Sequence, residues 1–145
     1  MITPYLLYED VSGALKFLSM AFGFRKCGVS VKGPGGKLNH ASMKFRSGLV
    51  MMGCPGPEYK NPKKLGQSTQ CLYVNVKNVD KHFARAQGAG AMILEEPQNT
   101  PYGHRRYGAE DPEGHQWYFA QPIKAVAARK RAAGQSKPRR RRTSR

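Results

Sequence analysis

Cysteine is scarce in this sequence, with three residues among 145: Cys27, Cys54 and Cys71. An odd and widely spaced set predicts no disulfide framework, fits no zinc or redox motif, and indicates reduced thiols in a cytoplasm. Long hydrophobic runs are also missing, since no stretch approaches the roughly 18 apolar residues that a membrane span needs. The first ten residues, MITPYLLYED, contain no basic segment and no small-residue cleavage site, so we expect a cytoplasmic chain that is not exported.

Acidic residues are the second scarcity, because 9 Asp and Glu stand against 25 Lys and Arg, a formal net charge of +16. The imbalance lies mostly at the C-terminal end, where 10 of the basic residues and none of the acids follow Ile123. Residues 1–123 therefore hold 15 basic and 9 acidic residues, a net charge of +6. We predict that residues 124–145 form a disordered basic tail that binds nucleic acid and other polyanions weakly and nonspecifically, because no aromatic residue lies among its arginines to stack on bases.

The sequence has the length and, with 39% hydrophobic residues, the composition of one domain with a hydrophobic core. Its first half reads as a strand, ITPYLLYE, then a helix, then the three strands RKCGVSV, KLNHASMKF and LVMMG, separated by PGG and SG turns. Asp10 is the expected N-cap of the helix and Gly23 its C-cap. The helix has an apolar stripe of helical period, made of Val11, Ala14, Leu15, Leu18 and Phe22.

The second half repeats this order of elements. CLYVNV reads as a strand, VDKHFARAQGAG as a helix with Asn78 as N-cap, and AMILEE, HRRYGAE and HQWYFAQ as strands. A shift of 68 residues places Tyr5 on Tyr73 and Asp10 on Asn78, which indicates a duplicated βαβββ unit. We predict an α+β fold in one domain, residues 1–123, with two modules (about 1–53 and 69–123) joined by the linker 54–68 and curled mixed sheets around a cleft.

Three stretches of this sequence resemble the glyoxalase/bleomycin-resistance/dioxygenase superfamily, also called the vicinal oxygen chelate (VOC domain) fold. They are DVSGALKFLSMAFGF at 10–24, YGHR at 102–105 and DPEGHQW at 111–117. The resemblance covers about residues 2–122 and is closest to the small PhnB-like proteins. It implies the paired-module fold and, as in many relatives, a homodimer, but one fold hosts many activities and the resemblance does not fix the reaction.

Active members of this family bind a divalent metal through His and Glu ligands from four strands, and two substrate oxygens chelate the metal. Carried over to this sequence, the four ligand positions are Thr3, Met51, Cys71 and Tyr118. Such side chains do not supply the imidazole and carboxylate ligands that a hard cation needs, so we expect no metal and no other cofactor. The alternative is a metal-dependent lyase, isomerase or dioxygenase of the glyoxalase type with non-standard ligands, such as His40 combined with His104 or Glu95.

The resemblance and the missing ligands together favour a metal-free protein that binds or sequesters a small organic molecule, rather than an enzyme. Strand alternation places aromatic, thioether and amide side chains on the cleft face, a lining that suits an organic ligand. Because residues 1–123 are net basic, an anionic or neutral ligand fits better than a cation. The candidate ligand-binding residues are Tyr5, His40, Met51, Tyr73, Gln116 and Tyr118.

The polar stretch from residue 102 to 119 allows both catalytic and structural interpretations. In the catalytic interpretation, His104 or His115 is a candidate general base, and Arg105 is a candidate for binding an anionic substrate. As architecture, Asp111 begins a type I turn, the ring of His115 bonds the neighbouring loop, and Arg105 pairs with Glu110 or Asp111. We favour the structural interpretation for this stretch and leave the catalytic residues unassigned.

Overall fold

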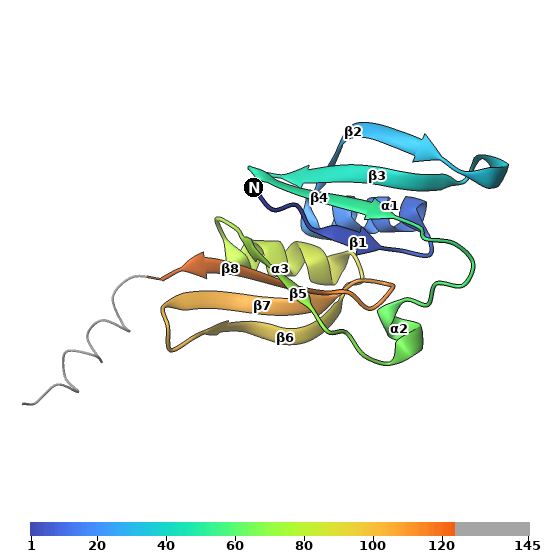
Figure 1. Ribbon diagram of the computed structural model, residues 1–145. Helices are drawn as coiled ribbons and strands as arrows, with labels where there is room; N and C mark the ends of the chain where they lie inside the picture. Colours follow the sequence, from blue (N-terminus) through green and yellow to red (C-terminus); the bar gives the residue numbers. More distant parts are fainter. Residues whose placement is uncertain (124–145) are drawn as a thin grey trace, which may run out of the picture.

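The computed structural model of this protein describes residues 1–123, which form two four-stranded sheets, each accompanied by one long helix (Figure 1). The first module consists of β1 (Tyr5–Leu7), α1 (Val11–Phe22), β2 (Arg25–Lys32), β3 (Leu38–Phe45) and β4 (Gly48–Gly53). The second consists of β5 (Cys71–Asn75), α3 (Val79–Gly88), β6 (Met92–Asn99), β7 (His104–Glu110) and β8 (Gln116–Pro122). Between them the linker contains a short helix, α2 (Pro62–Leu65), and the basic tail predicted at 124–145 lies outside the described residues.

The strand order is the same in both sheets, β1-β4-β3-β2 and β5-β8-β7-β6. In each sheet the first strand of the module pairs in parallel with the last, and the other pairs are antiparallel. Tyr5 lies opposite Met51 in the first sheet, and Tyr73 lies opposite Tyr118 in the second. The predicted duplication of a βαβββ unit is therefore confirmed, including the equivalence of Tyr5 and Tyr73.

Both long helices begin as the sequence predicts, and α1 also ends as predicted, whereas α3 ends at Gly88, two residues before the predicted end. The Asp10 side chain accepts a hydrogen bond from the backbone N–H of Gly13, and the Asn78 side chain accepts one from Lys81. Gly23 ends α1 in the left-handed region, with φ of 79°, where a side chain would be strained. The helices thus satisfy part of their terminal backbone groups from their own sequence.

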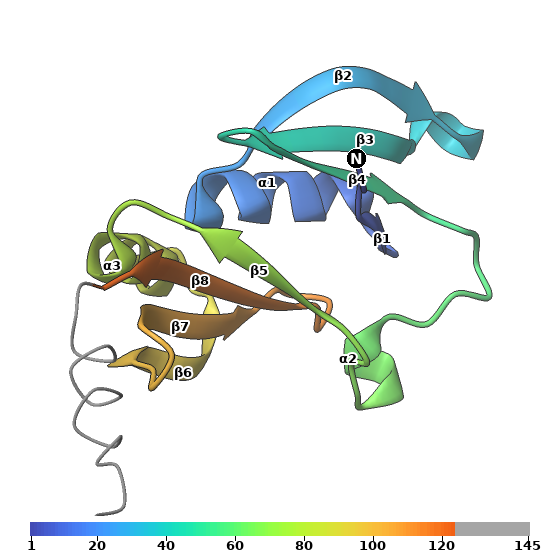
Figure 2. The same ribbon diagram turned by 60° about the vertical axis from the view of Figure 1, so that its left-hand side comes forward.

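The two modules share one hydrophobic core rather than having one each. The helices α1 and α3 pack against each other, and in Figure 2 α1 lies between the sheet of β2, β3 and β4 and the strands β5 and β8. The ring of Phe22, at the end of α1, lies 5.7 Å from that of Trp117 and 4.7 Å from that of Phe119, both on β8. All three side chains are fully buried, so the stability of each module depends on the other.

A hydrogen-bonded junction also joins the modules at the turn between β7 and β8. The buried carboxylate of Asp111 accepts hydrogen bonds from the Tyr8 hydroxyl, at 2.7 Å, and from Trp117 Nε1, at 3.1 Å. The Glu113 carboxylate accepts the backbone N–H groups of Glu9, at 2.7 Å, and Asp10, at 3.0 Å, just before α1 begins. The backbone N–H of Gly114 donates to the Asp111 carbonyl at 3.0 Å, so a turn begins at Asp111 as predicted, and it also holds the first module in place.

Strand alternation gives each sheet an inner face toward the helices and an outer face away from them. On β4, Met52 is fully buried on the inner face, whereas Met51 lies on the outer face beside Tyr5. We call the two surfaces that carry Tyr5 and Tyr73 the outer faces. Among residues 1–123, no helix is long and apolar enough to span a membrane.

Candidate functional site

The outer face of the first sheet carries a tyrosine–histidine pair. The hydroxyl of Tyr5 lies 2.9 Å from Nδ1 of His40, and the two rings are stacked with centroids 5.7 Å apart. The tyrosine reaches across β4 at Gly53, where a Cβ would collide with its ring and hydroxyl. Three predicted candidates, Tyr5, His40 and Met51, therefore lie together on this face.

The outer face of the second sheet carries a second pair of the same kind. The hydroxyl of Tyr73 lies 2.8 Å from Nδ1 of His104, which is the first residue of β7. Beside it the ring of Tyr118 covers Gly108, where a Cβ would lie 2.7 Å from Tyr118 Cε1. Each outer face thus carries a tyrosine–histidine pair and a glycine beneath an aromatic ring. Only Tyr5 and Tyr73 are equivalent in the repeat, because Gly53 lies on β4 and Gly108 on β7, and the two histidines occupy different rows of their sheets.

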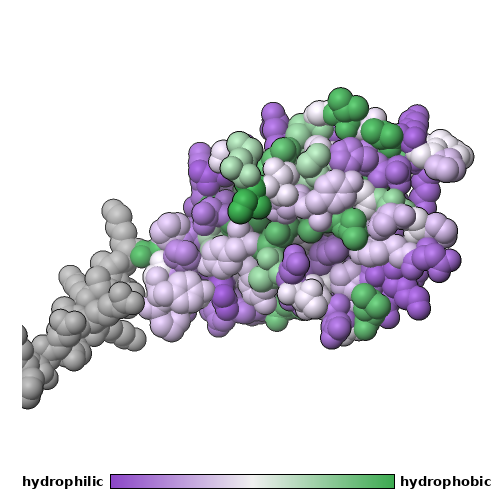
Figure 3. All heavy atoms as spheres, viewed as in Figure 1, coloured by the Kyte–Doolittle hydropathy of each residue, from purple (hydrophilic) through white to green (hydrophobic). Residues whose placement is uncertain are grey.

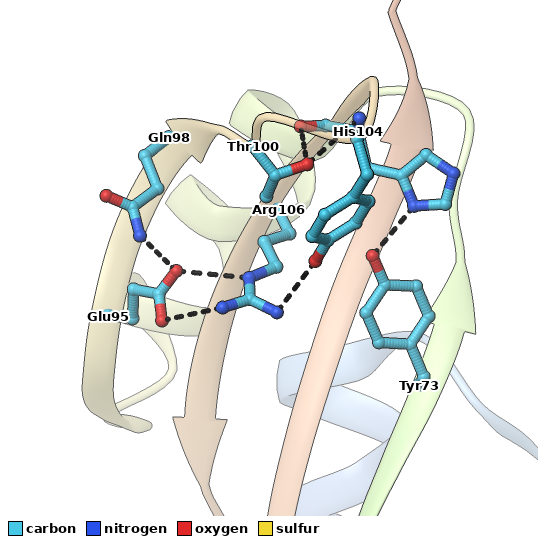
Figure 4. Close-up of polar contacts among 7 residues, drawn as sticks. Tyr73, Glu95, Gln98, Thr100, His104 and Arg106 are labelled. Carbon is cyan, nitrogen blue, oxygen red and sulfur yellow. Dashed lines mark hydrogen bonds and ion pairs between the residues drawn. The ribbon is translucent and has the colours of Figure 1, made fainter.

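An arginine network extends the second pair across the sheet (Figure 4). Arg106 Nε lies 3.2 Å from a Glu95 carboxylate oxygen, Arg106 Nη1 donates to the Tyr102 hydroxyl at 2.9 Å, and the guanidinium lies 5.2 Å from the centre of the Tyr118 ring. Gln98 donates a further hydrogen bond to Glu95. Sequence reasoning missed Arg106, although alternation along HRRYGAE places it on the same face as His104.

The surroundings of Tyr73 keep its hydroxyl protonated. Partial burial of the side chain, together with the neighbouring hydroxyl of Tyr102, raises the pKa of Tyr73 to about 12. A protonated hydroxyl can donate to Nδ1 of His104, and a neutral histidine that accepts at Nδ1 carries its proton at Nε2. In this tautomer His104 presents an N–H group as a donor to a ligand on the outer face.

Cys71 and Gln116 face each other across β5 and β8 and approach the first module. Together with Tyr5 they line a hollow of about 300 Å³ between the modules, which the linker closes on another side. Thr3 precedes β1 and belongs to none of these groups. The predicted candidates therefore form two outer-face groups that meet near this hollow.

Two structural predictions in the polar stretch named the wrong partners. His115 Nε2 hydrogen-bonds the backbone oxygen of Leu7, the last residue of β1, at 2.7 Å, so its ring joins the two modules rather than bonding its own loop. The predicted partner of Arg105 is wrong, because Arg105 bonds Asp80 on α3, at 2.9 Å, rather than an acid of its own hairpin. Glu110 lies on the opposite face of β7 by alternation, and the carboxylate of Asp111 is held by Tyr8 and Trp117.

The residues at the family's metal positions do not fit a metal ion. Thr3, Met51, Cys71 and Tyr118 provide neither imidazole nor carboxylate. Within residues 1–123, no three His, Cys, Asp or Glu side chains gather in a group suited to hold a metal. The pairs formed by His40 and His104 lie on different sheets, and Glu95 is engaged by Arg106. We therefore derive no chemical step through a metal.

The surface seen in Figure 3 mixes hydrophobic and hydrophilic side chains without one large apolar area. Exposed aromatic rings contribute to the outer faces, since Tyr5 is 51% exposed and Tyr73 44% exposed. A ligand on these faces would meet rings and hydrogen-bonding groups together, which is the usual lining of sites for small organic molecules.

Comparison with known proteins identifies the family. The model of the Glyoxalase/Bleomycin resistance protein/Dioxygenase superfamily matches residues 3–119. The chain belongs to this superfamily. The crystal structure of TioX from Micromonospora sp. ML1 is similar, with 33% sequence identity, a TM-score of 0.68, and coverage of 84% of this chain and 98% of that one.

Two further proteins are similar to this chain. An uncharacterized protein of Mycobacterium tuberculosis (strain H37Rv) is 32% identical over 130 residues, which is 86% of this chain and 76% of that protein. A glyoxalase/bleomycin resistance protein/dioxygenase family enzyme from Burkholderia phytofirmans PsJN has a TM-score of 0.64 at 15% identity, covering 83% of this chain and 97% of that one. At this identity the second likeness concerns the fold alone.

Proposed function

We propose that this superfamily member binds a small planar organic molecule on its outer faces, without a metal ion. The observation that carries the proposal is a tyrosine–histidine pair on the outer face of each sheet, Tyr5 with His40 and Tyr73 with His104. The side chains at the family's metal positions support it, since Met51 and Tyr118 suit contact with an organic molecule better than coordination.

The chemistry of the second outer face favours a neutral or anionic aromatic ligand. The rings of Tyr73 and Tyr118 offer surfaces for stacking, and His104 offers an N–H donor to a carbonyl or other acceptor of the ligand. Arg106 is paired with Glu95, so this face does not attract cations strongly. The net charge of +6 on residues 1–123 acts in the same direction.

A thermal-shift screen of planar aromatic compounds tests the proposal. We expect some compounds to raise the melting temperature of the wild type, because a ligand at 100 times its Kd stabilises the folded state by about 2.7 kcal/mol. The variants Tyr118→Ala and Tyr5→Ala should lose this shift, and Met20→Ala, at an exposed site on α1, should keep it. Shifts that persist in both tyrosine variants would place the ligand elsewhere.

Elemental analysis of the purified protein separates this proposal from the metal-dependent alternative. We expect substoichiometric metal and ligand-induced stabilisation that survives treatment with EDTA. Stoichiometric zinc, nickel, iron or manganese would instead favour a lyase, isomerase or dioxygenase that uses non-standard ligands. The measurement requires no knowledge of the ligand.

We further propose that the protein is a homodimer and a cytoplasmic member of the PhnB-like branch. Exposed apolar side chains on the edge strands β2 and β6 support a dimer, with Val29 on β2 76% exposed and Met92 on β6 56% exposed. The three cysteines are unpaired thiols, in keeping with a reducing compartment. Light scattering at micromolar concentration should give twice the mass of 16.1 kDa, and a monomer mass would contradict the dimer.

A further inference from the structure

A basic hollow lies where the connection between β5 and α3 meets the turn between β3 and β4. Its volume is about 390 Å³, and it is separate from the tyrosine–histidine pairs of the outer faces. Four of its lining side chains are basic and none is acidic; they are Arg46, Lys77, Lys81 and Arg85. A concave surface lined by one sign of charge raises the local concentration of ions of the opposite sign.

The duplicated fold shows what this position holds in the other module. Before α1, the carboxylate of Glu113 accepts the backbone N–H groups of Glu9 and Asp10. The 68-residue repeat makes Lys77 and Asn78 the equivalents of these two residues. In the described part of the chain, the backbone N–H groups of Lys77 and Asn78 have no hydrogen-bond acceptor. The second module thus repeats the donors without repeating the carboxylate.

The difference arises from the two hairpin turns that face these connections. The turn between β7 and β8 spans residues 111–115 and is long enough to insert Glu113. The turn between β3 and β4 contains only Arg46 and Ser47, and Arg46 adopts a φ of 53°, in the left-handed region. The short turn therefore leaves a space at the β5–α3 connection and places a cation beside it, where the first junction has an anion.

Three of the four cations remain available to a ligand. Arg85 donates to the backbone oxygens of Ser19 and Met20 at the end of α1. Arg46, Lys77 and Lys81 form no ion pair with any of residues 1–123. Asp80, the acid next to Lys81, is held by Arg105.

An apolar groove continues from the basic hollow along the boundary between the modules. Its volume is about 450 Å³, and it shares Phe45 and Arg46 with the hollow. Leu49 from β4 and Leu72 and Val74 from β5 are among the apolar residues on its walls, and Tyr73 of the second tyrosine–histidine pair also lines it. We propose that the two together form a binding site for an organic anion, with its carboxylate or phosphate group in the basic hollow and its apolar body in the groove.

Calorimetric titration of the full-length protein with octanoate tests this site. We expect the double variant Lys77→Gln/Lys81→Gln to bind octanoate about tenfold more weakly, because it loses two charge-assisted contacts. The matched control Lys16→Gln/Lys32→Gln removes the same charge from exposed positions elsewhere and should change the Kd less than twofold. Equal weakening in both double variants would show diffuse attraction and overturn the site.

Further measurements keep the result independent of folding and of the proposed function. Lys77→Arg/Lys81→Arg should retain octanoate binding, and loss of binding in this charge-preserving variant would contradict the proposal. Octanoate should shift the backbone amide NMR signals of Lys77 and Asn78, and absence of shifts at saturation would overturn it. Acetate should bind more weakly than octanoate; equal affinity would remove the groove from the site. Tyr118→Ala should bind octanoate normally, even if the outer faces bind no ligand.

Discussion

Two glycines decide how the tyrosines of the outer faces lie. At Gly53 and Gly108 the absence of a Cβ lets the rings of Tyr5 and Tyr118 rest against the strand backbone. Any larger residue would force the rings outward into solvent. The shape of the candidate site therefore depends on residues that make no polar contact with a ligand.

Substitution of Gly108 by alanine should weaken ligand binding on the second outer face. The new methyl group would lie 2.7 Å from Tyr118 Cε1, so the ring must move and lose its position beneath Arg106. We expect a destabilisation of about 1–3 kcal/mol, typical of overpacking, together with loss of the ligand-induced thermal shift. Gly88→Ala, where a Cβ meets nothing within 4 Å, is the matched control and should keep the shift.

His82 is a residue that the sequence alone did not single out. Its Nδ1 lies 2.5 Å from the Tyr107 hydroxyl and its Nε2 lies 2.8 Å from the backbone oxygen of Phe22, so Nε2 must carry a proton. Burial lowers the pKa of His82 from its ordinary value of 6.5, with Arg85 acting in the same direction. The neutral imidazole thus bridges the two modules.

The stability of the protein should therefore decrease as the pH falls below about 6.5. Because the pKa of His82 is lower in the folded chain, the unfolded chain binds this proton more readily, so the contribution is complete above pH 6.5 and is lost as the pH falls through the folded-state pKa. Urea denaturation at pH 7 and pH 5.5 measures the change. His82→Gln should show a smaller difference between the two pH values, and an unchanged difference would assign the effect to other groups.

At the residue scale, the sequence predicted where side chains lie in the sheets better than it predicted which residues they contact. Duplication and alternation can be read directly from the sequence, so Tyr5 and Tyr73 were correctly placed at equivalent positions of their sheets. The partner of Arg105 was wrong because Asp80 lies 25 residues away, on a helix whose position depends on the whole fold. His82 was missed for the same reason, since a helical period does not show that a polar residue contacts the other module.

Among the elements, the turn between β7 and β8 has the largest structural role. Its residues close the β7–β8 hairpin, where the Asp111 side chain accepts the backbone N–H groups of Glu113 and His115. They also contact the connection between β1 and α1 through Glu113. Glu113 additionally accepts a hydrogen bond from Asn61 of the linker, at 3.1 Å. One side chain therefore joins the first module, the linker and the second module.

Removal of the Glu113 carboxylate should destabilise the whole domain. Glu113→Ala leaves the backbone N–H groups of Glu9 and Asp10 without their acceptor, which should cost about 2–4 kcal/mol. Urea denaturation gives the free energy of unfolding. Glu58→Ala, at an exposed acid of the linker, is the control and should change it by less than about 0.5 kcal/mol. A similar effect of both variants would indicate a general charge effect.

The sequence predicted the order of the elements, while their extents depend on pairing. β6 was expected to end with AMILEE but continues to Asn99, because its partner β7 supplies hydrogen bonds past Pro97, with register shifts along the way. β1 is shorter than expected, at three residues, since the chain must turn toward α1. The helix α2 was not expected, because its four residues have no apolar period to indicate it.

At the scale of the whole molecule, the predicted basic tail should contribute charge alone. We expect truncation after Ile123 to abolish retention on DNA-cellulose at low salt and to leave the melting temperature unchanged, because residues 1–123 contain the shared core. Affinity of the full chain should fall with a slope of roughly −0.9 in log K against log salt for each phosphate neutralised. Undiminished retention of the truncated protein would identify residues 1–123 as the binding surface.

The shared core has a consequence for the order of events during synthesis. Phe22 packs on Trp117 and Phe119, and the Glu113 carboxylate accepts the backbone N–H of Glu9 just before α1 begins. The first module is therefore completed by residues about one hundred positions later in the chain. A nascent chain that has released only residues 1–53 from the ribosome should therefore expose the apolar side of α1. We expect such chains to be captured by chaperones and cleaved readily by proteases, until β8 emerges and both halves fold in one cooperative step.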